Sequence, residues 1–117
     1  MSDSITELQL RLRYFAEVRE WQPFHSPKNL SMALIAEAAE LVEHFQWLSE
    51  QQSRELSSEK QQAVAMELAD IFIYLIRCAD QLGVDLIAAA HQKCTLNEQR
   101  YPVERVRGIA GRAADYQ

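Results

Sequence analysis

The chain is poor in residues that build turns and in residues that cross-link small folds. It has 3 glycines, 3 prolines and 2 cysteines among 117 residues. So few turn formers disfavour a β-sandwich or barrel, in which many short strands need frequent turns. Cys78 and Cys94 lack the spacing of a redox or metal motif. We therefore expect reduced thiols in a cytoplasmic protein.

Long apolar runs and basic runs are also missing. The longest apolar stretch, residues 71–76, is far too short to span a bilayer, and residues 1–4 lack the pattern of a signal peptide. The net charge is −5, and no cluster of Lys and Arg is present to neutralise a phosphate backbone. We expect neither a membrane nor a nucleic acid as partner.

What the sequence does have is helical periodicity. Hydrophobic residues make up 48% of the chain and recur at steps of three and four. Together with the boundary residues, this period predicts helices over 4–20, 27–48, 58–82 and 86–100, with a polar turn at 49–58. A chain of this length corresponds to one domain. We predict a single all-α domain, 1–117, with its core at 4–101 and a flexible tail at 102–117.

Short polar residues and glycine mark where these helices begin and end. Ser26 precedes a proline, which is well tolerated in a first helical turn. Ser58 with Gln61 resembles a capping box. Gly83 is placed to cap the end of that helix, and Asp85 to cap the start of the next.

Two pairs of acids organise the chain: Glu37 with Glu40, and Glu67 with Asp70. The members of each pair are three residues apart and project from one side of a helix. If the two helices form an antiparallel hairpin, position 37 lies level with 70 and position 40 with 67. Four carboxylates at one level between apolar neighbours repel one another unless some are protonated or a cation binds. Oxygen ligands suit Mg²⁺ or Mn²⁺, so we predict a metal site; the alternative is two solvated acidic faces.

The third predicted helix is apolar around its whole circumference at residues 71–76. A helix of this kind has to be covered on all sides, which three other short helices can hardly achieve. We therefore predict a protomer resembling a four-helix bundle, built around the antiparallel hairpin and completed by oligomerisation. The expected assembly is a homo-oligomer, either a dimer or a tetramer.

Taken in order, the motifs resemble the MazG-like nucleoside triphosphate pyrophosphohydrolases, and within them the dCTP pyrophosphatase-like branch. These are all-α enzymes that cleave nucleoside triphosphates to the monophosphate and pyrophosphate. The resemblance covers roughly residues 10–102. The matching segments are Glu20-Trp21, Phe24-His25-x-Pro27-Lys28-Asn29-Leu30, Glu37-x-x-Glu40-Leu41, Phe45-Gln46-Trp47, Glu67-Leu68-x-Asp70-Ile71-x-Ile73-Tyr74-Leu75, and Lys93 to Asn97 followed by Arg100-Tyr101-Pro102.

The resemblance implies a function and a set of metal ligands. Glu37, Glu40, Glu67 and Asp70 would hold Mg²⁺, with Mn²⁺ as a substitute, and a glutamate of the first pair, Glu37 or Glu40, would act as general base. The substrate would be a nucleoside triphosphate, with deoxynucleotides such as dCTP favoured, and the role would be house-cleaning of the nucleotide pool.

The same resemblance points to residues around the base and sugar. Trp21 and Trp47 flank the second predicted helix and could stack on the base, although both could also be core or interface aromatics. Tyr74 lies one turn after Asp70 and could pack against the sugar, or be a core tyrosine. His25 and Asn29 belong to the matched segment beside Trp21, and His25 could equally be a hydrogen-bonded anchor of its loop.

A third group of residues follows helical steps near the end of the last predicted helix: Lys93, Asn97, Arg100 and Tyr101. Together they make one polar face that could receive the β- and γ-phosphates. The alternative is an ordinary solvated face.

Two other classes of protein compete with this interpretation. A carboxylate-bridged di-iron protein needs Glu-x-x-His on two helices, and here no glutamate has histidine at the third following position. A non-catalytic helical assembly module would explain the apolar third helix. It would not explain four acids at one level.

Overall fold

The computed structural model describes residues 4–116, and every regular element within that range is helical. The elements are α1 (Ser4–Val18), η1 (Gln22–Phe24), α2 (Pro27–Glu43), α3 (Glu50–Arg54), α4 (Ser58–Leu82), α5 (Leu86–Arg100), α6 (Val103–Val106) and η2 (Ala113–Tyr116). The described residues contain no strand, which confirms the all-α prediction.

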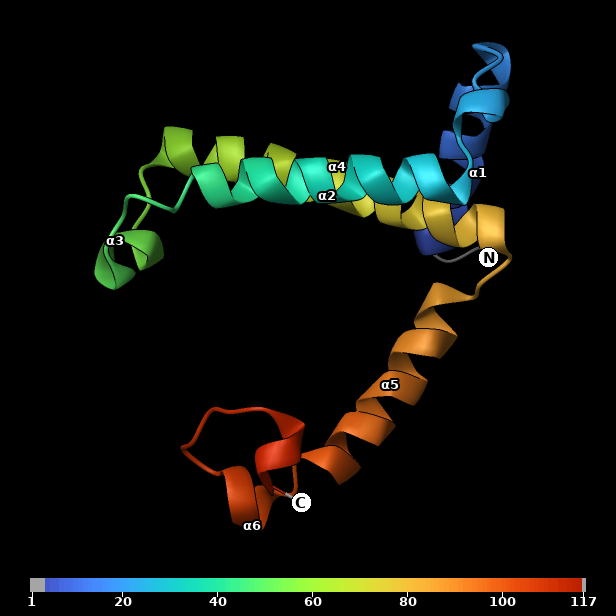
Figure 1. Ribbon diagram of the computed structural model, residues 1–117. Coiled ribbons are helices and arrows are strands. Elements are labelled where there is room, and N and C mark those ends of the chain that lie inside the picture. The colour runs from blue at the N-terminus through green and yellow to red at the C-terminus, as the bar shows by residue number, and fades with distance from the viewer. Residues whose placement is uncertain (1–3, 117) are drawn as a thin grey trace. The chain divides into compact units, whose positions relative to one another are not determined.

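An antiparallel hairpin of α2 and α4 is the centre of the fold, as the acid pairs predicted. The two helices lie side by side along most of the length of α2, and α1 packs against the later turns of α4 (Figure 1). Apolar side chains from all three helices are buried here: Ala16, Leu30, Val64 and Ile76. The hairpin therefore fixes the level at which residues of α2 face residues of α4.

By its internal contacts the chain divides between Gly83 and Val84 into two compact units. The first holds α1 to α4, and the second holds α5, α6 and η2. The single-domain prediction remains a prediction, as does the flexible tail. Within that tail the structure has α6 and η2, and Gln117 lies outside the described residues.

The predicted end of the second helix, at Leu48, was wrong. The helix ends at Glu43, and a series of turns follows in which Phe45 N–H bonds to the carbonyl of Val42. Between Glu43 and Ser49 the N–H groups of His44, Phe45 and Leu48 bond to carbonyls three residues back, so the backbone tightens into turns instead of continuing the α-helix. Ser49 then has an extended backbone and begins a separate short helix, α3, in a complete capping box with Gln52.

The other boundary residues act largely as predicted. Ser26 accepts a hydrogen bond from the backbone of Asn29, and Asp85 from that of Ala88. Gly83 adopts the left-handed conformation, with φ of 66°, at the end of α4. α4 runs from Ser58 to Leu82 as predicted, but its cap is Ser57 rather than Ser58, and Ser57 accepts a hydrogen bond from the backbone of Lys60.

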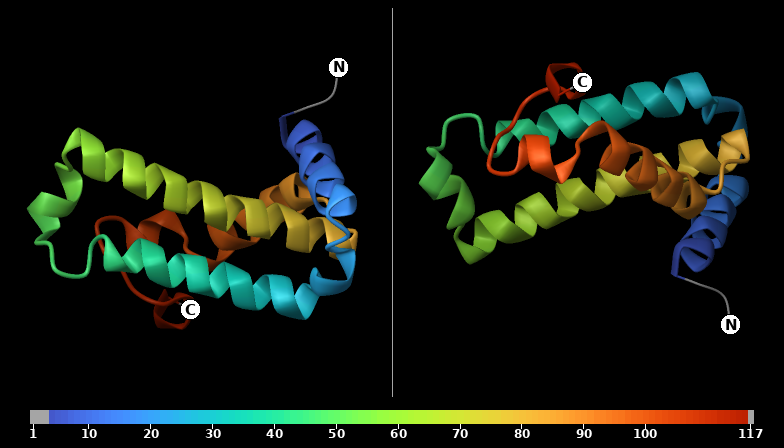
Figure 2. Two further views of the ribbon diagram at one scale, coloured as in Figure 1. Left: turned by 90° about the horizontal axis from the view of Figure 1, so that it is seen from above. Right: turned by 90° about the horizontal axis from the view of Figure 1, so that it is seen from below.

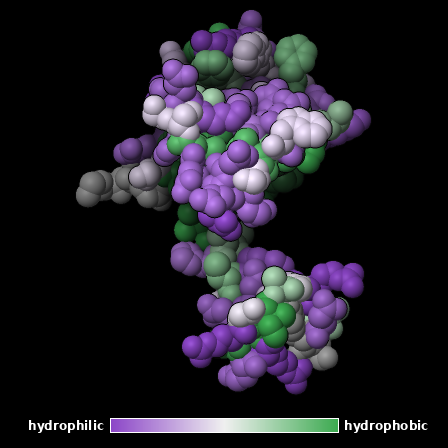
Figure 3. Space-filling view, turned by 90° about the vertical axis from the view of Figure 1, so that its left-hand side faces the viewer, coloured by the Kyte–Doolittle hydropathy of each residue, from purple (hydrophilic) through white to green (hydrophobic). Residues whose placement is uncertain are grey.

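Different helices lie at the two ends of the hairpin. One end carries α3 in the connection between α2 and α4, and α1 lies at the other (Figure 2). In a view onto the α3 end, hydrophilic side chains predominate at the surface (Figure 3). No helix of the described chain combines the length and hydropathy needed to cross a membrane.

Candidate active site

The hairpin brings acids from α2 and α4 together at one level. One carboxylate oxygen each of Glu37, Glu67 and Asp70 lies within 4.8 Å of the others. We call these three residues the carboxylate cluster. Their closeness follows from the predicted register, in which position 37 lies level with position 70.

Glu40, the fourth predicted ligand, lies beside the cluster on the exposed side of α2. Its carboxyl group interacts with those of Glu37 and Glu67, although Glu40 does not belong to the group whose oxygens lie within 4.8 Å. Glu40 is exposed, whereas Glu37 and Glu67 are half-buried. The structure therefore distinguishes an inner set of three acids from one outer acid.

Burial and the repulsion of neighbouring acids make Glu37 and Glu67 reluctant to ionise. Desolvation, hydrogen bonds to Glu40 and Glu67, and the negative charges of Glu40 and Asp70 raise the pKa of Glu37 to about 7. Desolvation is also the main cause that raises the pKa of Glu67. Groups whose charged form is disfavoured in this way are stabilised by a nearby cation.

The cluster also has unused acceptors. Glu37 Oε2 and Glu67 Oε2 are buried and have no hydrogen-bond partner within the described chain. Buried polar atoms are nearly always paired, so two unpaired carboxylate oxygens at one site require an explanation. A hard divalent cation bound between the helices would supply it, because carboxylate oxygens are the ligands it prefers. The residues present therefore fit a metal ion.

A pocket of about 540 Å³ begins at the cluster. Asp70 belongs both to the cluster and to the pocket wall. The rest of the wall comes from α1, the segment before α2, and α4; it consists of Leu8, Arg11, Leu12, Phe15, Trp21, His25, Ile73, Tyr74 and Arg77. This volume is in the usual range for a small-molecule site.

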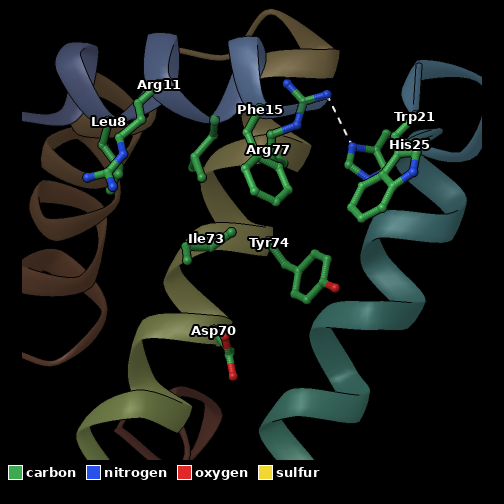
Figure 4. Close-up of a pocket in the computed structure, with 10 residues that line it drawn as sticks. Leu8, Arg11, Phe15, Trp21, His25, Asp70, Ile73, Tyr74 and Arg77 are labelled. Atoms are coloured by element: carbon green, nitrogen blue, oxygen red, sulfur yellow. Dashed lines mark hydrogen bonds between the residues drawn. The ribbon is translucent and has the colours of Figure 1, made fainter. Parts of the chain in front are cut away.

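One face of α4 runs along the pocket. Asp70, Ile73, Tyr74 and Arg77 follow steps of three, one and three, which places them on one side of a helix. Figure 4 shows Asp70 at one end, Ile73 and Tyr74 between, and Arg77 at the other end beside His25. At 1.5 Å per residue, Asp70 and Arg77 are about 10 Å apart along the helix axis.

The end of α1 positions the aromatic part of the pocket. Glu20 has a left-handed backbone, with φ of 55°, and Trp21 N–H bonds back to the carbonyl of Ala16. Together with the bond from Glu20 N–H to Glu17, this is a Schellman ending. It turns Trp21 toward Phe15, with ring centroids 5.7 Å apart in an edge-to-face arrangement.

Arg77 is held at its end of the pocket by two partners. Its side chain is only 3% exposed; Nη1 donates to Asp80 at 3.3 Å, and Nη2 donates to His25 Nδ1 at 3.3 Å. A guanidinium has only donors, so Nδ1 of His25 accepts and the ring proton is on Nε2. Burial and the charge of Arg77 both lower the pKa of His25, consistent with this neutral form.

The structure gathers only part of the predicted base and sugar site. Trp21, His25 and Tyr74 line the pocket. Asn29 does not; its side-chain amide donates to the carbonyl of Phe24 and secures the loop before α2. Trp47 follows the far end of α2 and is 87% exposed. The base-binding role of Asn29 and Trp47 stays a prediction.

The predicted phosphate-binding residues belong to the second unit. Lys93 and Arg100 are exposed on α5, and Asn97 is half-buried. Tyr101 caps that helix, with its N–H bonded to the carbonyl of Asn97. Their role remains a prediction too.

Comparison with known proteins identifies the family. The model of the MazG-like family matches residues 33–115, which include the whole carboxylate cluster, all of α5 and most of the residues after it. The chain belongs to the MazG-like family. This confirms the resemblance drawn from the motifs.

Relatives of this MazG-like chain include mammalian enzymes and an archaeal structure. It is 41% identical over 103 residues to dCTP pyrophosphatase 1 of Rattus norvegicus, covering 86% of this chain and 61% of that protein. The chain is 39% identical over 95 residues to the Homo sapiens protein of the same name, covering 80% of this chain and 56% of that protein. The chain thus spans about three fifths of the length of these relatives. A pyrophosphatase structure from Archaeoglobus fulgidus superposes with a TM-score of 0.82 at 36% identity, covering 87% of this chain and 95% of that one.

Sequence reasoning missed several residues of the pocket, most importantly Arg77. The sequence carried a signal, because Arg77 is one of few charged residues in an apolar helix and follows Asp70 by two helical turns. Arg77 could be recognised as a pocket residue only with the knowledge that α1 crosses α4 near position 77. Arg11 and Phe15 were missed for the same reason.

Proposed function

We propose that this MazG-like protein is a Mg²⁺-dependent nucleoside triphosphate pyrophosphohydrolase that converts the substrate to the monophosphate and pyrophosphate. The proposal depends on one observation: Asp70 belongs both to the carboxylate cluster and to the wall of the pocket. A metal site adjoining a base-sized pocket with aromatic walls suits a ligand with a polyphosphate at one end and a flat ring at the other. The names of the relatives support the same reaction.

The substrate is anionic, and so is the protein. With a net charge of −5, the chain repels a triphosphate unless positive charge is present at the site. We propose that Glu37, Glu67 and Asp70, with Glu40 from the outer side, hold Mg²⁺ or Mn²⁺, which when bound offsets charge on the phosphates in the ground and transition states.

The chain's own residues have distinct parts in this proposal. Glu37 or Glu40 accepts the proton of the water that attacks the α-phosphorus. Trp21 offers a flat face to the base, and Tyr74, between Asp70 and Arg77, packs against the sugar. Lys93, Asn97, Arg100 and Tyr101 bind the β- and γ-phosphates that leave as pyrophosphate. Deoxynucleotides such as dCTP are the favoured substrates, and house-cleaning of the cytoplasmic nucleotide pool is the role.

We also propose that the protein is a homo-oligomer, a dimer or tetramer. Leu68, Phe72 and Leu75 follow steps of four and three on α4 and are 52%, 40% and 36% exposed. Large apolar side chains in a stripe of this kind are usually covered by a partner. A second copy of the chain is the partner proposed.

Release of pyrophosphate tests the proposed function. Purified protein is incubated with a panel of dNTPs and NTPs at fixed Mg²⁺, and pyrophosphate and monophosphate are quantified together. We expect equal amounts of both products, loss of both in a Glu40→Ala variant, and retention in Glu43→Ala, which removes the next acid on α2 outside the site. Release that is unchanged in Glu40→Ala would contradict the mechanism. A non-catalytic assembly module would release neither product.

A further inference from the structure

Three rings meet at the end of α1. Trp21, which we expect to stack on the base, lies edge-to-face against Phe15, with ring centroids 5.7 Å apart, and against His25, with ring centroids 6.1 Å apart. Trp21 lines the pocket and is 42% exposed, so part of its ring is open to a ligand. The orientation of the Trp21 ring therefore depends on how firmly Phe15 and His25 are fixed.

Phe15 and His25 are fixed in different ways. Phe15 belongs to α1, and its position follows from the helical backbone. His25 lies between η1 and α2, where its backbone, with φ of −101° and ψ of 44°, follows no regular element. A side chain on such a segment takes its orientation from tertiary contacts. The contact here comes from Arg77 on α4, whose Nη2 donates to His25 Nδ1 at 3.3 Å (Figure 4).

Arg77 is itself fixed before a ligand arrives. Its Nη1 donates to Asp80 at 3.3 Å. Asp80 also accepts from Gln9 Nε2 at 2.6 Å and from Arg13 Nη2 at 2.7 Å, and both residues are on α1. A continuous chain of hydrogen bonds therefore runs from α1 through Asp80 and Arg77 to the ring of His25.

Arg77 has little surface of its own to offer a ligand. Its side chain is only 3% exposed, although it belongs to the pocket wall. What Arg77 contributes to ligand binding is therefore transmitted through the residues that it contacts. His25 is the contact that leads to Trp21.

Resting on the proposed function, we propose that Arg77 is a positioning residue for base binding: by fixing the imidazole of His25, it holds the Trp21 ring in the orientation that receives the base. A ring that is already held in place loses less conformational freedom when the base arrives. The hydrogen bond to Nδ1 suits this role, because a guanidinium has only donors and keeps the same partner whether or not a ligand is present.

The arrangement predicts a defect in binding rather than in chemistry. The stacking contact is the same before and during the reaction, so losing part of it weakens the ground state and the transition state equally. We expect Arg77→Met to raise the KM for dCTP about three- to tenfold and to change kcat less than about twofold. Asp80 keeps Gln9 and Arg13 as partners in this variant, so the substitution does not strand a buried charge.

The first measurement follows Trp21 without any substrate. Trp21 and Trp47 are the two tryptophans of the chain, and Trp47 is 87% exposed, so Trp47→Phe leaves Trp21 as the single indole without disturbing a buried contact. In this background Arg77→Met and His25→Ala should each increase the amplitude of the sub-nanosecond anisotropy decay of Trp21 fluorescence, because a freed ring moves on that timescale. An unchanged decay in either variant would overturn the proposal.

A further variant keeps this test decisive if Arg77→Met does not fold. Arg77→Lys retains a positive charge beside Asp80, but an ammonium is a single point and lacks the fork that spans Asp80 and His25. The anisotropy decay of Trp21 should change in the same direction as in His25→Ala. A decay like that of the unsubstituted background would contradict the role given to the guanidinium.

A kinetic cycle shows whether Arg77 acts through His25. In the His25→Ala background, Arg77→Met should raise KM no further, since the ring that Arg77 fixes is already absent. If the two substitutions instead multiply their effects on KM, Arg77 acts by another route and the proposal is wrong.

Arg13→Met is the matched control. Arg13 bonds the same Asp80 carboxylate but does not line the pocket, so its removal disturbs the network and leaves the hydrogen bond between Arg77 and His25 in place. The KM and the anisotropy decay of Trp21 should both stay unchanged. Changes as large as those of Arg77→Met would show a general loosening of α1 and would refute positioning by Arg77.

The outcome is separable from that of the proposed function. Pyrophosphate release with an unchanged KM and an unchanged Trp21 decay in Arg77→Met refutes positioning by Arg77 and leaves the reaction intact. A freer Trp21 ring in Arg77→Met, without any release by the wild-type protein, refutes the reaction and leaves Arg77 as the residue that orients the ring.

Discussion

Asp80 ties α1 to α4 through a single carboxylate. It accepts from Gln9 and Arg13 on α1 and from Arg77 on its own helix, and its side chain is only 8% exposed. The hydrogen bonds from Arg13 and Gln9, with the charges of Arg13 and Arg77, outweigh desolvation and lower the pKa of Asp80. The Asp80 carboxylate therefore links α1 to α4 and fixes the side chain of Arg77 in the pocket wall.

Asp80→Asn should destabilise the protein in a pH-dependent manner. The folded-state pKa of Asp80 lies below the ordinary value of 3.8, so its contribution is present above that value and is lost as the pH falls through the folded pKa. We expect a loss of about 1–3 kcal/mol in the free energy of unfolding at pH 7. Urea unfolding of both proteins as a function of pH measures it. A difference that stays constant down to pH 3 or grows there would contradict this account.

Glu20 is the residue with the strained backbone. It has φ of 55° at the end of α1, a conformation that favours glycine. Glu20→Gly should raise the free energy of unfolding by up to about 1 kcal/mol, since it relieves the strain without removing a buried contact. Glu17→Gly, inside the helix, is the control and should lower it by about 1 kcal/mol. Denaturant melts of the two variants giving the same sign would show that the conformation at position 20 is not strained.

At the scale of elements, the hairpin carries a repulsion that a cation should relieve. The pKa of Glu37 is raised from 4.5 to about 7 in the folded protein, so the stability of EDTA-treated protein should fall as the pH rises between these values. Glu37→Gln should remove most of this fall. It should also abolish the rise in Tm that Mg²⁺ or Mn²⁺ gives the wild-type protein. Thermal melts with EDTA and with excess metal measure both effects, and an equal metal-induced shift in the variant would refute the assignment.

The sequence predicted the elements better than their ends. Acid spacing and apolar periodicity sufficed for the α2–α4 hairpin, because register in a hairpin follows from position alone. The end of α2 was missed because Leu41, Val42, Phe45 and Leu48 continue a helical pattern, whereas the backbone after Glu43 changes to turns whose N–H groups bond three residues back. Local hydrogen bonds decided this boundary, and apolar periodicity does not report them.

The pocket was predictable only in part, for a physical reason. Trp21, His25 and Tyr74 could be named because they belong to motifs, and all three line it. Arg77 and Arg11 could not, because the pocket wall depends on how α1 crosses α4, which is a tertiary contact between residues far apart in sequence. Asp80, which anchors that crossing, depends on the same tertiary contact, because its partners Gln9 and Arg13 are on α1.

At the scale of the whole molecule, the apolar stripe on α4 should govern assembly. Leu68, in the middle of α4, is 52% exposed in the single chain. If a second copy covers it, Leu68→Glu buries a charge at the interface and should shift the protein to monomers in sedimentation velocity experiments. Gln61→Glu, an exposed polar position on the same helix, is the control and should leave the mass unchanged. A wild-type protein that is monomeric at all concentrations tested would end the oligomer proposal.

The hairpin of α2 and α4 gathers the acids that we propose hold a divalent cation. Electron paramagnetic resonance of Mn²⁺ titrated into the protein tests this most directly, because bound and free Mn²⁺ are distinguished without reference to any substrate. We predict binding by the wild-type protein, binding by Glu43→Gln, and loss of binding in Glu67→Gln, whose buried oxygen is unpaired in the structure. Equal binding by the wild-type protein and Glu67→Gln, or no binding by either, would show that the carboxylate cluster is not a divalent-cation site.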